Sequence, residues 1–229
     1  MKKILLLITT VILFNCTNDN YDSIDTNNSI EMVSEFNKWY HRGEYEYFNG
    51  ATATIESTKI YLTYFFDGDT LINNVEYKKM YTNQLDSIFH LPSSSSAYQF
   101  ISTSTSLNYR CAMRQDESMV YFVNKNQNNE ELYADFNITL GDVLNYKWSS
   151  NNEVVTEIES IPIGDSYLKK YKLSNNQYFY EAIGGSYGLF KDWSVGFEGG
   201  HYLNCFRHSN DKISVDESLS PTNNYCPEY

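Results

Sequence analysis

The sequence predicts an all-β fold, in which antiparallel strands follow one another as a meander and form a strongly curved or barrel-like sheet. Aromatic residues make up 16% of the 229-residue chain, including 21 Tyr, and such residues favour half-buried pleated surfaces. Apolar and polar side chains alternate along most of the chain, as they do in strands. Turn residues separate these segments at short spacing, which favours neighbouring antiparallel strands. Eight or more such strands tend to curl. A two-layer β-sandwich is the alternative.

The clearest strand is predicted over residues 59–66, where Ile60, Leu62 and Tyr64 share one face. A turn is predicted at Asp67 to Thr70, because Asp and Gly favour turns, and a hairpin is predicted at Ile163-Gly164-Asp165. Further strands are predicted at 75–81, 119–123, 154–161, 167–173, 178–183 and 201–208. The Ser/Thr-rich residues 87–106 are predicted to be a long loop plus an edge strand. Residues 30–40 are the one segment outside the leader that allows a short helix.

The N-terminus predicts export. Lys2 and Lys3 precede an apolar run from Ile4 to Phe14 that only two threonines interrupt. That run is shorter than the roughly 20 residues of a membrane-spanning helix and is typical of a signal peptide. Residues 1–15 are therefore predicted to be a signal peptide, with Cys16 as the first mature residue.

The segment Leu13-Phe14-Asn15-Cys16 resembles a lipobox, with bulkier residues than usual before the cysteine. Cys16 is thus the predicted lipidation site, and the lipid would hold the protein on a membrane. Residues 16–35, rich in Asn, Asp and Ser, are predicted to be a flexible acidic tether, and residues 36–229 a single β domain. The predicted location is the outer membrane, on its periplasmic or its cell-surface face.

The charge balance excludes one class of partner. The chain has 17 basic and 29 acidic side chains, a formal net charge of −12. Removing residues 1–15 takes away two lysines and no acid, which leaves −14. Nucleic acid is therefore not an expected partner, because phosphate binding needs clustered Lys and Arg. A protein or glycan partner is left open.

Several short blocks, in order, resemble a domain of secreted proteins in the Bacteroidetes. The first, Tyr64 to Tyr81, is similar to its "YFxGDTxING-xxYxKLY" opening. The later blocks are Tyr109–Asp116 ("Y-x-G-x-x-RED"), Val120–Phe122 ("VYY"), Leu132–Asp142 ("LLYDF-x-L-x-x-GD"), Glu181–Leu189 ("WIEGIGSxxGL") and Leu203–Cys226 ("LxCF…C"). Cys111 stands where glycine is usual and Gln115 where glutamate is usual. The resemblance implies a lipoprotein or secretion-system cargo domain, and it implies no activity.

Three cysteines remain after Cys16. Export means an oxidising compartment, in which Cys205 and Cys226 are predicted to form a disulfide. Such a bond stabilises by roughly 3 kcal/mol in the chain-entropy model. Cys111 is then predicted to be a buried free thiol.

No catalytic or metal-binding set is predicted, and no cofactor. The segment around Ser186, Gly184-Gly185-Ser186-Tyr187-Gly188, matches the G-x-S-x-G pattern of a hydrolase nucleophile, with His201 downstream. That motif needs a parallel sheet and a following helix, so a glycine turn is preferred. His201 and His208 lie seven positions apart and face opposite ways on a strand. Ser186 stays the nucleophile of a disfavoured hydrolase alternative.

Ser23, Thr70 and Ser87 follow aspartate in a pattern that resembles the O-glycosylation motif of this bacterial group. Arg114 is predicted to pair with Asp116 or Asp135 at the surface. The preferred function is a non-enzymatic binding or scaffolding domain in the cell envelope. The alternative is a carrier of apolar ligands in a barrel-like cavity.

Overall fold

The computed structural model describes residues 29–92, 94–144, 146–147, 153–185, 189–190 and 199–214, with the backbone alone at 199–202 and 214. No helix of a length and hydropathy suited to crossing a bilayer occurs among them. The segment 30–40, which the sequence allowed as a short helix, forms turns and then the start of a strand. Its alternating Trp39 and His41 point into the buried side of a sheet, which is the reason for the extended backbone.

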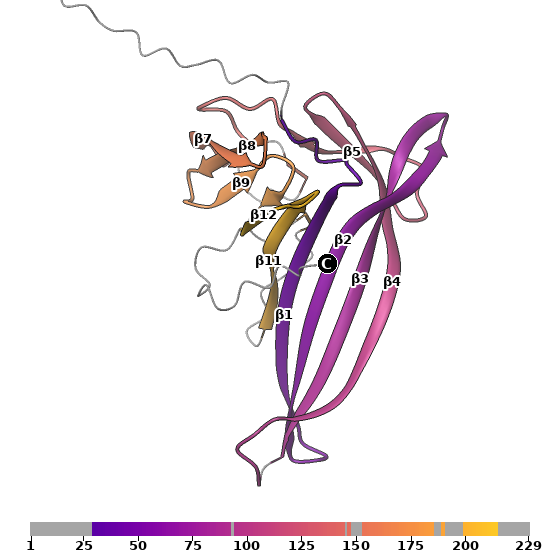
Figure 1. Ribbon diagram of the computed structural model, residues 1–229, viewed down its shortest axis with the longest axis vertical. Coiled ribbons are helices and arrows are strands. Elements are labelled where there is room, and N and C mark those ends of the chain that lie inside the picture. The colour runs from indigo at the N-terminus through magenta and orange to yellow at the C-terminus, as the bar shows by residue number, and fades with distance from the viewer. Residues whose placement is uncertain are drawn as a thin grey trace, which may run out of the picture.

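Two antiparallel sheets contain the described strands (Figure 1). The larger has the order β12-β11-β1-β2-β3-β4-β5-β6, and the smaller has the order β10-β9-β8-β7. The strands are β1 (Asn37–Asn49), β2 (Thr54–Ile72), β3 (Val75–Pro92), β4 (Gln99–Asp116), β5 (Met119–Asn124), β6 (Glu131–Asp135), β7 (Val155–Ile163), β8 (Ser166–Leu173), β9 (Tyr178–Tyr180), β10 (Gly184–Gly185), β11 (Gly199–His208) and β12 (Asp211–Ser214). The predicted all-β antiparallel meander is confirmed, and the eight-stranded sheet is curved but open.

The predicted alternation on β2 sets which face of the large sheet is inner. Leu62, Tyr64 and Phe66 are at most 5% exposed, while the intervening side chains face outward. The inner face packs against the small sheet and the segments around it, where the fully buried side chains include Trp39 and Tyr171. Aromatic rings fill this core; Phe136 and Phe179, for example, stack with centroids 5.7 Å apart.

The packed domain begins before residue 36, the predicted boundary. Ile30 and Met32 are buried in the main core. The side-chain oxygen of Gln115 accepts hydrogen bonds from the backbone N–H of Met32 at 2.7 Å and of Val33 at 3.3 Å. The side chain of Gln115 therefore holds the segment that leads into β1. Residues 29–35, the described part of the predicted tether, are thus fixed against the sheet.

The turns differ in part from the prediction. Ile163-Gly164-Asp165 joins β7 to β8 as expected, with Gly164 at φ +57°. Asp67 to Thr70 does not turn the chain, because β2 continues to Ile72 through a bulge that places Gly68 at φ +69°. The turn lies at Asn73 and Asn74, both with positive φ. Paired asparagines suit the two-residue hairpin turn that matches strand twist.

The far ends of β1 to β4 extend beyond the core as a narrow projection, which forms the tapered end in Figure 1. We call it the arm; it comprises residues 44–49, 54–61, 84–92 and 99–107. Part of the Ser/Thr-rich segment 87–106 is thus regular strand, and the predicted loop is confined to the connection between Pro92 and Gln99. β4 is an interior strand of the large sheet because β5 pairs with its second half, but its first half has β3 as its one partner among the described strands, which fits the predicted edge strand in part.

Candidate functional site

Four of the residues singled out in the sequence lie outside the described residues. These are Cys16, Ser23, Ser186 and Cys226, so the lipid anchor, the hydrolase alternative and the Cys205–Cys226 disulfide stay predictions. Thr70 and Ser87 are described, and both lie within strands and are partly buried. Ser87 has a paired strand on each side, opposite Lys59 and Thr103.

His208, Cys111 and Cys205 lie in surroundings that suit a role in the fold. His208 hydrogen-bonds through Nδ1 to the Asn37 side chain at 2.8 Å, and the side chain of His201 is outside the description. Cys111 is a buried free thiol, as predicted, and burial raises its pKa to about 12. Cys205 is buried on β11. No group of three or more potential ligands is placed to hold a metal ion within the part of the chain that the structure describes.

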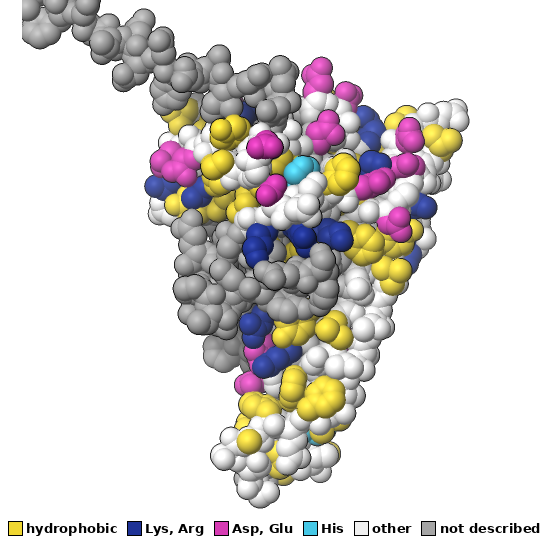
Figure 2. Space-filling view, in the orientation of Figure 1, with side chains coloured by type: hydrophobic (Ala, Val, Ile, Leu, Met, Phe, Trp, Pro, Cys, Tyr) yellow, Lys and Arg dark blue, Asp and Glu magenta, His cyan; other side chains and the backbone are white. Residues whose placement is uncertain are grey.

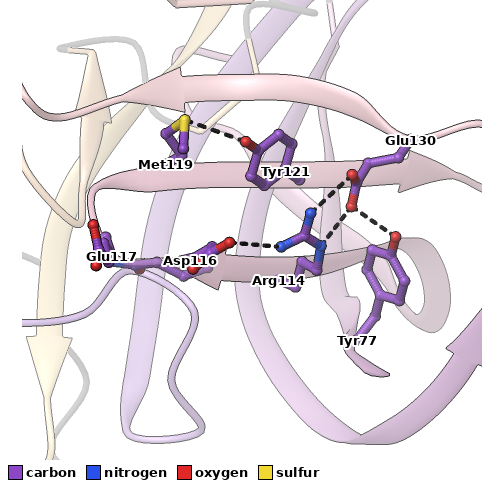
Figure 3. A network of polar contacts seen from close by, with 8 residues as sticks. Tyr77, Arg114, Asp116, Glu117, Met119, Tyr121 and Glu130 are labelled. Atoms are coloured by element: carbon purple, nitrogen blue, oxygen red, sulfur yellow. Dashed lines mark hydrogen bonds and ion pairs between the residues drawn. The ribbon is translucent and has the colours of Figure 1, made fainter. Parts of the chain in front are cut away.

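A polar network joins β3, β4 and the segment before β6 (Figure 3). Arg114 donates to both carboxylate oxygens of Glu130, from Nε at 2.6 Å and from Nη2 at 2.9 Å. The Tyr77 hydroxyl donates to Glu130 Oε1 at 2.7 Å, and Asp116 lies 3.6 Å from Arg114 Nη1. The guanidinium also covers the ring of Tyr121, 4.2 Å from its centroid.

This network is best explained as a structural clamp. The hydrogen bonds from Arg114 hold the pKa of Glu130 below its ordinary value, and burial together with Glu130 raises the pKa of Tyr77. Each group thereby stays in the charge state that it has in water at neutral pH, so none is poised to transfer a proton. The predicted Arg114–Asp116 pair is present, but the bidentate partner is Glu130.

A single line of side chains crosses the outer face of the large sheet. Strand register places Lys212, Arg207, Lys38, Phe65, Tyr81 and Tyr109 opposite one another on β12, β11, β1, β2, β3 and β4. Directly opposed residues of antiparallel strands share a face. We call this line the outer row; its first half is basic and its second half aromatic.

The outer row is accessible to a ligand. Lys38 and Lys212 are exposed, and the other four side chains are partly exposed. Phe65 and Tyr81 stack with ring planes 27° apart and centroids at 6.1 Å, and Tyr109 continues the line, 5.6 Å from Tyr81. Figure 2 shows Lys and Arg side chains gathered across the upper middle of this face, with hydrophobic side chains beside them. The row spans five strand spacings, roughly 24 Å.

A pocket of about 380 Å³ lies beside the end of the outer row, where Tyr109 is one of its lining residues, and its other walls include Cys111 and Phe190 of the inner core. Arg110 and Lys125 line it too, together with the side chains Asn108, Cys111, Asn124 and Phe190. The strand register shifts here because Arg110 is an extra residue on β4. The polar and basic lining does not match a carrier of apolar ligands, for which mostly apolar walls are expected.

The sequence analysis did not find the outer row. Its six members are spread from residue 38 to residue 212, so only the strand register brings them together. The alternating pattern of residues 59–66 already indicated that Phe65 faces away from the core. The chain matches no protein-family model, no curated protein and no solved structure to which it was compared, so the resemblance to a Bacteroidetes secreted domain stays a prediction.

Proposed function

We propose that the protein is a non-enzymatic binding protein of the bacterial cell envelope, whose outer row binds a linear acidic polysaccharide. The observation that supports it is the joined line of three cations and three aromatic rings on one face. Aromatic faces carry negative charge and attract the C–H faces of sugar rings. Cations beside them attract carboxylate or sulfate groups.

The basic end of the row stands out against the charge of the whole molecule. Three of the 17 basic side chains, Lys38, Arg207 and Lys212, lie on one line of a chain with 29 acids. An acidic ligand is attracted to that line and repelled by the acidic rest of the molecule. These forces orient the ligand along the row, across the strands. An acidic peptide would satisfy the cations, but it would leave the stacked rings of Phe65 and Tyr81 without a flat partner.

Binding to charge-matched pairs of polysaccharides tests this function. Pectate is compared with fully methyl-esterified pectin, and dextran sulfate with dextran, by titration calorimetry or biolayer interferometry at low salt. We expect binding to at least one acidic polymer and none to its neutral form, with affinity falling as salt screens the charges. The double variant Lys38→Gln with Arg207→Gln should abolish this binding, and Tyr81→Thr should weaken it roughly three- to tenfold.

Matched controls separate the outer row from general charge. Lys172→Gln on the exposed side of β8 and Tyr98→Thr beyond β3 remove a cation and an aromatic ring away from the row. Both should bind as the unchanged protein does. Binding to neither acidic polymer, or equal losses in the controls, would overturn the proposal; tighter binding to polyglutamate than to the polysaccharides would point to a peptide ligand instead.

The envelope location rests on the N-terminal sequence. Lys2, Lys3, the apolar run and Cys16 together support processing as a lipoprotein. Cells that express the full chain are labelled with an alkyne-tagged fatty acid. We expect label on the protein and none on Cys16→Ser; equal labelling of both would contradict the anchor.

A further inference from the structure

We propose that two copies of the chain pair edge to edge through β4, so that their large sheets join into one. The inference is independent of the proposed polysaccharide site. Residues 99–109 of β4 pair with β3 on one side, apart from the bulge at Ile101, while β5 covers the other side from Cys111 to Asp116. Figure 1 shows β4 as the right-hand border of the arm, with no strand beyond it. Among the described residues no strand pairs with this half of β4 on that side, so a row of backbone donors and acceptors is open there.

This open edge lacks the usual protection against pairing. Natural edge strands carry charges or proline that repel another strand. The edge strands β6 and β7 follow that rule: β6 has Glu131 and Asp135, and β7 has Glu157 and Glu159. From Gln99 to Tyr109, β4 contains no charged residue, no proline and no glycine.

The edge also exposes apolar side chains. Phe100 is 59%, Ile101 49% and Leu107 65% exposed. Bulges at Ile101 and Arg110 bound a regular run between them, from Ser102 to Tyr109. An uncharged, strand-favouring and partly apolar run on an open edge is the pattern that pairs with another strand.

The sequence of this edge is complementary to itself. Around Ser104 it reads Ile-Ser-Thr-Ser-Thr-Ser-Leu, which is almost the same in both directions. An antiparallel pair of copies with a two-fold axis at Ser104 places Thr103 opposite Thr105 of the partner subunit and Ile101 opposite Leu107 of the partner subunit. Thr–Thr and apolar cross-strand pairs each stabilise a sheet.

The charges of the chain permit a second copy at this edge. Each molecule has a net charge of −12, so self-association needs a contact that brings no acids together. Pairing about Ser104 opposes no charged side chains, because residues 99–109 have none. A two-fold axis makes the same patch serve both subunits, as is usual in dimers. The seam is small compared with the roughly 800 Å² per partner of stable complexes, so we expect a dissociation constant of the order of micromolar.

Sedimentation equilibrium of the full chain in mild detergent, over a concentration series around the micromolar range, tests the pairing. We expect a monomer–dimer equilibrium. Ser104→Lys places two like charges at the axis and should weaken the dimer at least tenfold. The matched control is Thr156→Lys, a similar change on the exposed edge strand β7, and it should leave the equilibrium unchanged.

Cysteine crosslinking tests the register. Ser104→Cys brings two thiols directly opposite each other, within the Cα separation that a disulfide requires, whereas Thr103→Cys puts them on a diagonal. Mild oxidation should therefore crosslink Ser104→Cys and not Thr103→Cys. A chain that stays monomeric, a dimer that tolerates Ser104→Lys, or preferential crosslinking of Thr103→Cys would each overturn the proposal.

Discussion

Among the acidic side chains of the described polar networks, Glu130 is the one whose replacement should lower the stability of the fold most. Its two oxygens accept from Arg114, which keeps the pKa of Glu130 below its ordinary value. This contribution to stability is complete above the ordinary carboxylate pKa of about 4.3, and it is lost as the pH falls through the lower pKa of the folded state. We expect Glu130→Gln to lower the free energy of unfolding at pH 7 by about 1 kcal/mol, measured in urea.

The pH dependence provides the check on that prediction. At pH 3 the unchanged protein also begins to lose the ion pair, so the gap between it and Glu130→Gln should narrow. Asp116→Asn, whose carboxylate is 3.6 Å from Arg114 and exposed, should have little effect at either pH. A gap that stays constant with pH would contradict the assigned role of the charge.

Cys111 should be chemically silent in the folded protein. Its side chain is buried, and its pKa is raised to about 12, so almost no thiolate forms near neutral pH. Iodoacetamide at pH 8, followed by peptide mass spectrometry, should modify Cys111 only after unfolding in urea. Rapid modification of the native protein would show that this side of the sheet opens.

The sequence predicted the state of Cys111 but not the partner of Arg114. Cys111 was the cysteine left over once Cys16 was assigned to the lipid and Cys205 to Cys226, and a left-over free cysteine is usually buried. Glu130 lies 16 residues from Arg114, across β5 and the connection that follows it. Only the strand register brings the two together, and Asp116 was the nearer carboxylate in sequence.

Among the elements, the β7–β8 hairpin depends on a glycine. Gly164 has φ +57°, and a Cβ there would clash with Asp211 Oδ2 of β12. Gly164→Ala should therefore destabilise the fold by about 1–2 kcal/mol through backbone strain, with a further loss from the clash. Thermal unfolding measures the effect.

Two companion variants separate strain from clash. Gly141→Ala also has positive φ, at +92°, but its Cβ would meet nothing within 4 Å. It should show the strain alone. Adding Asp211→Ala to Gly164→Ala should recover the clash portion; a double variant as unstable as Gly164→Ala alone would mean that Asp211 simply moves aside.

The hairpins show where local signals suffice. Ile163-Gly164-Asp165 was placed correctly, because the strands on both sides are short and their register is regular next to the turn, the one shift lying at the far end between Val155 and Glu157. Asp67 to Thr70 was misplaced, because Gly68 serves a bulge within β2. Part of the segment 87–106 was taken for loop, because strands that are exposed on both faces lose the apolar alternation that identifies them.

At the scale of the whole molecule, salt should act in opposite directions on the two proposed interactions. Polysaccharide binding at the outer row is an attraction between unlike charges and weakens with salt. Pairing of two copies that each carry −12 through an uncharged seam should tighten with salt, because their mutual repulsion is screened. Binding and sedimentation measured at matched salt concentrations test both, and a dimer that salt dissociates would contradict an uncharged seam.

The fold class followed from composition and periodicity, while the global pairing did not. Consecutive strands β1 to β6 are neighbours, as a meander predicts. The placement of β11 beside β1 depends on contacts between distant segments, which no local pattern encodes. The outer row could not be predicted for the same reason, since its basic half is built on β12, β11 and β1.

The contact between β1 and β11 also governs how the chain can fold. Asn37 and His208 face each other across 171 residues. Any chain that emerges N-terminus first exposes β1 long before its neighbour on that side exists. Pairing between strands so far apart in the sequence is slow, typically milliseconds to seconds. Until β11 forms, the unpaired edge of β1 can pair with the wrong strand and cause misassembly. Nascent molecules should therefore depend on a holding chaperone until their last strands have emerged.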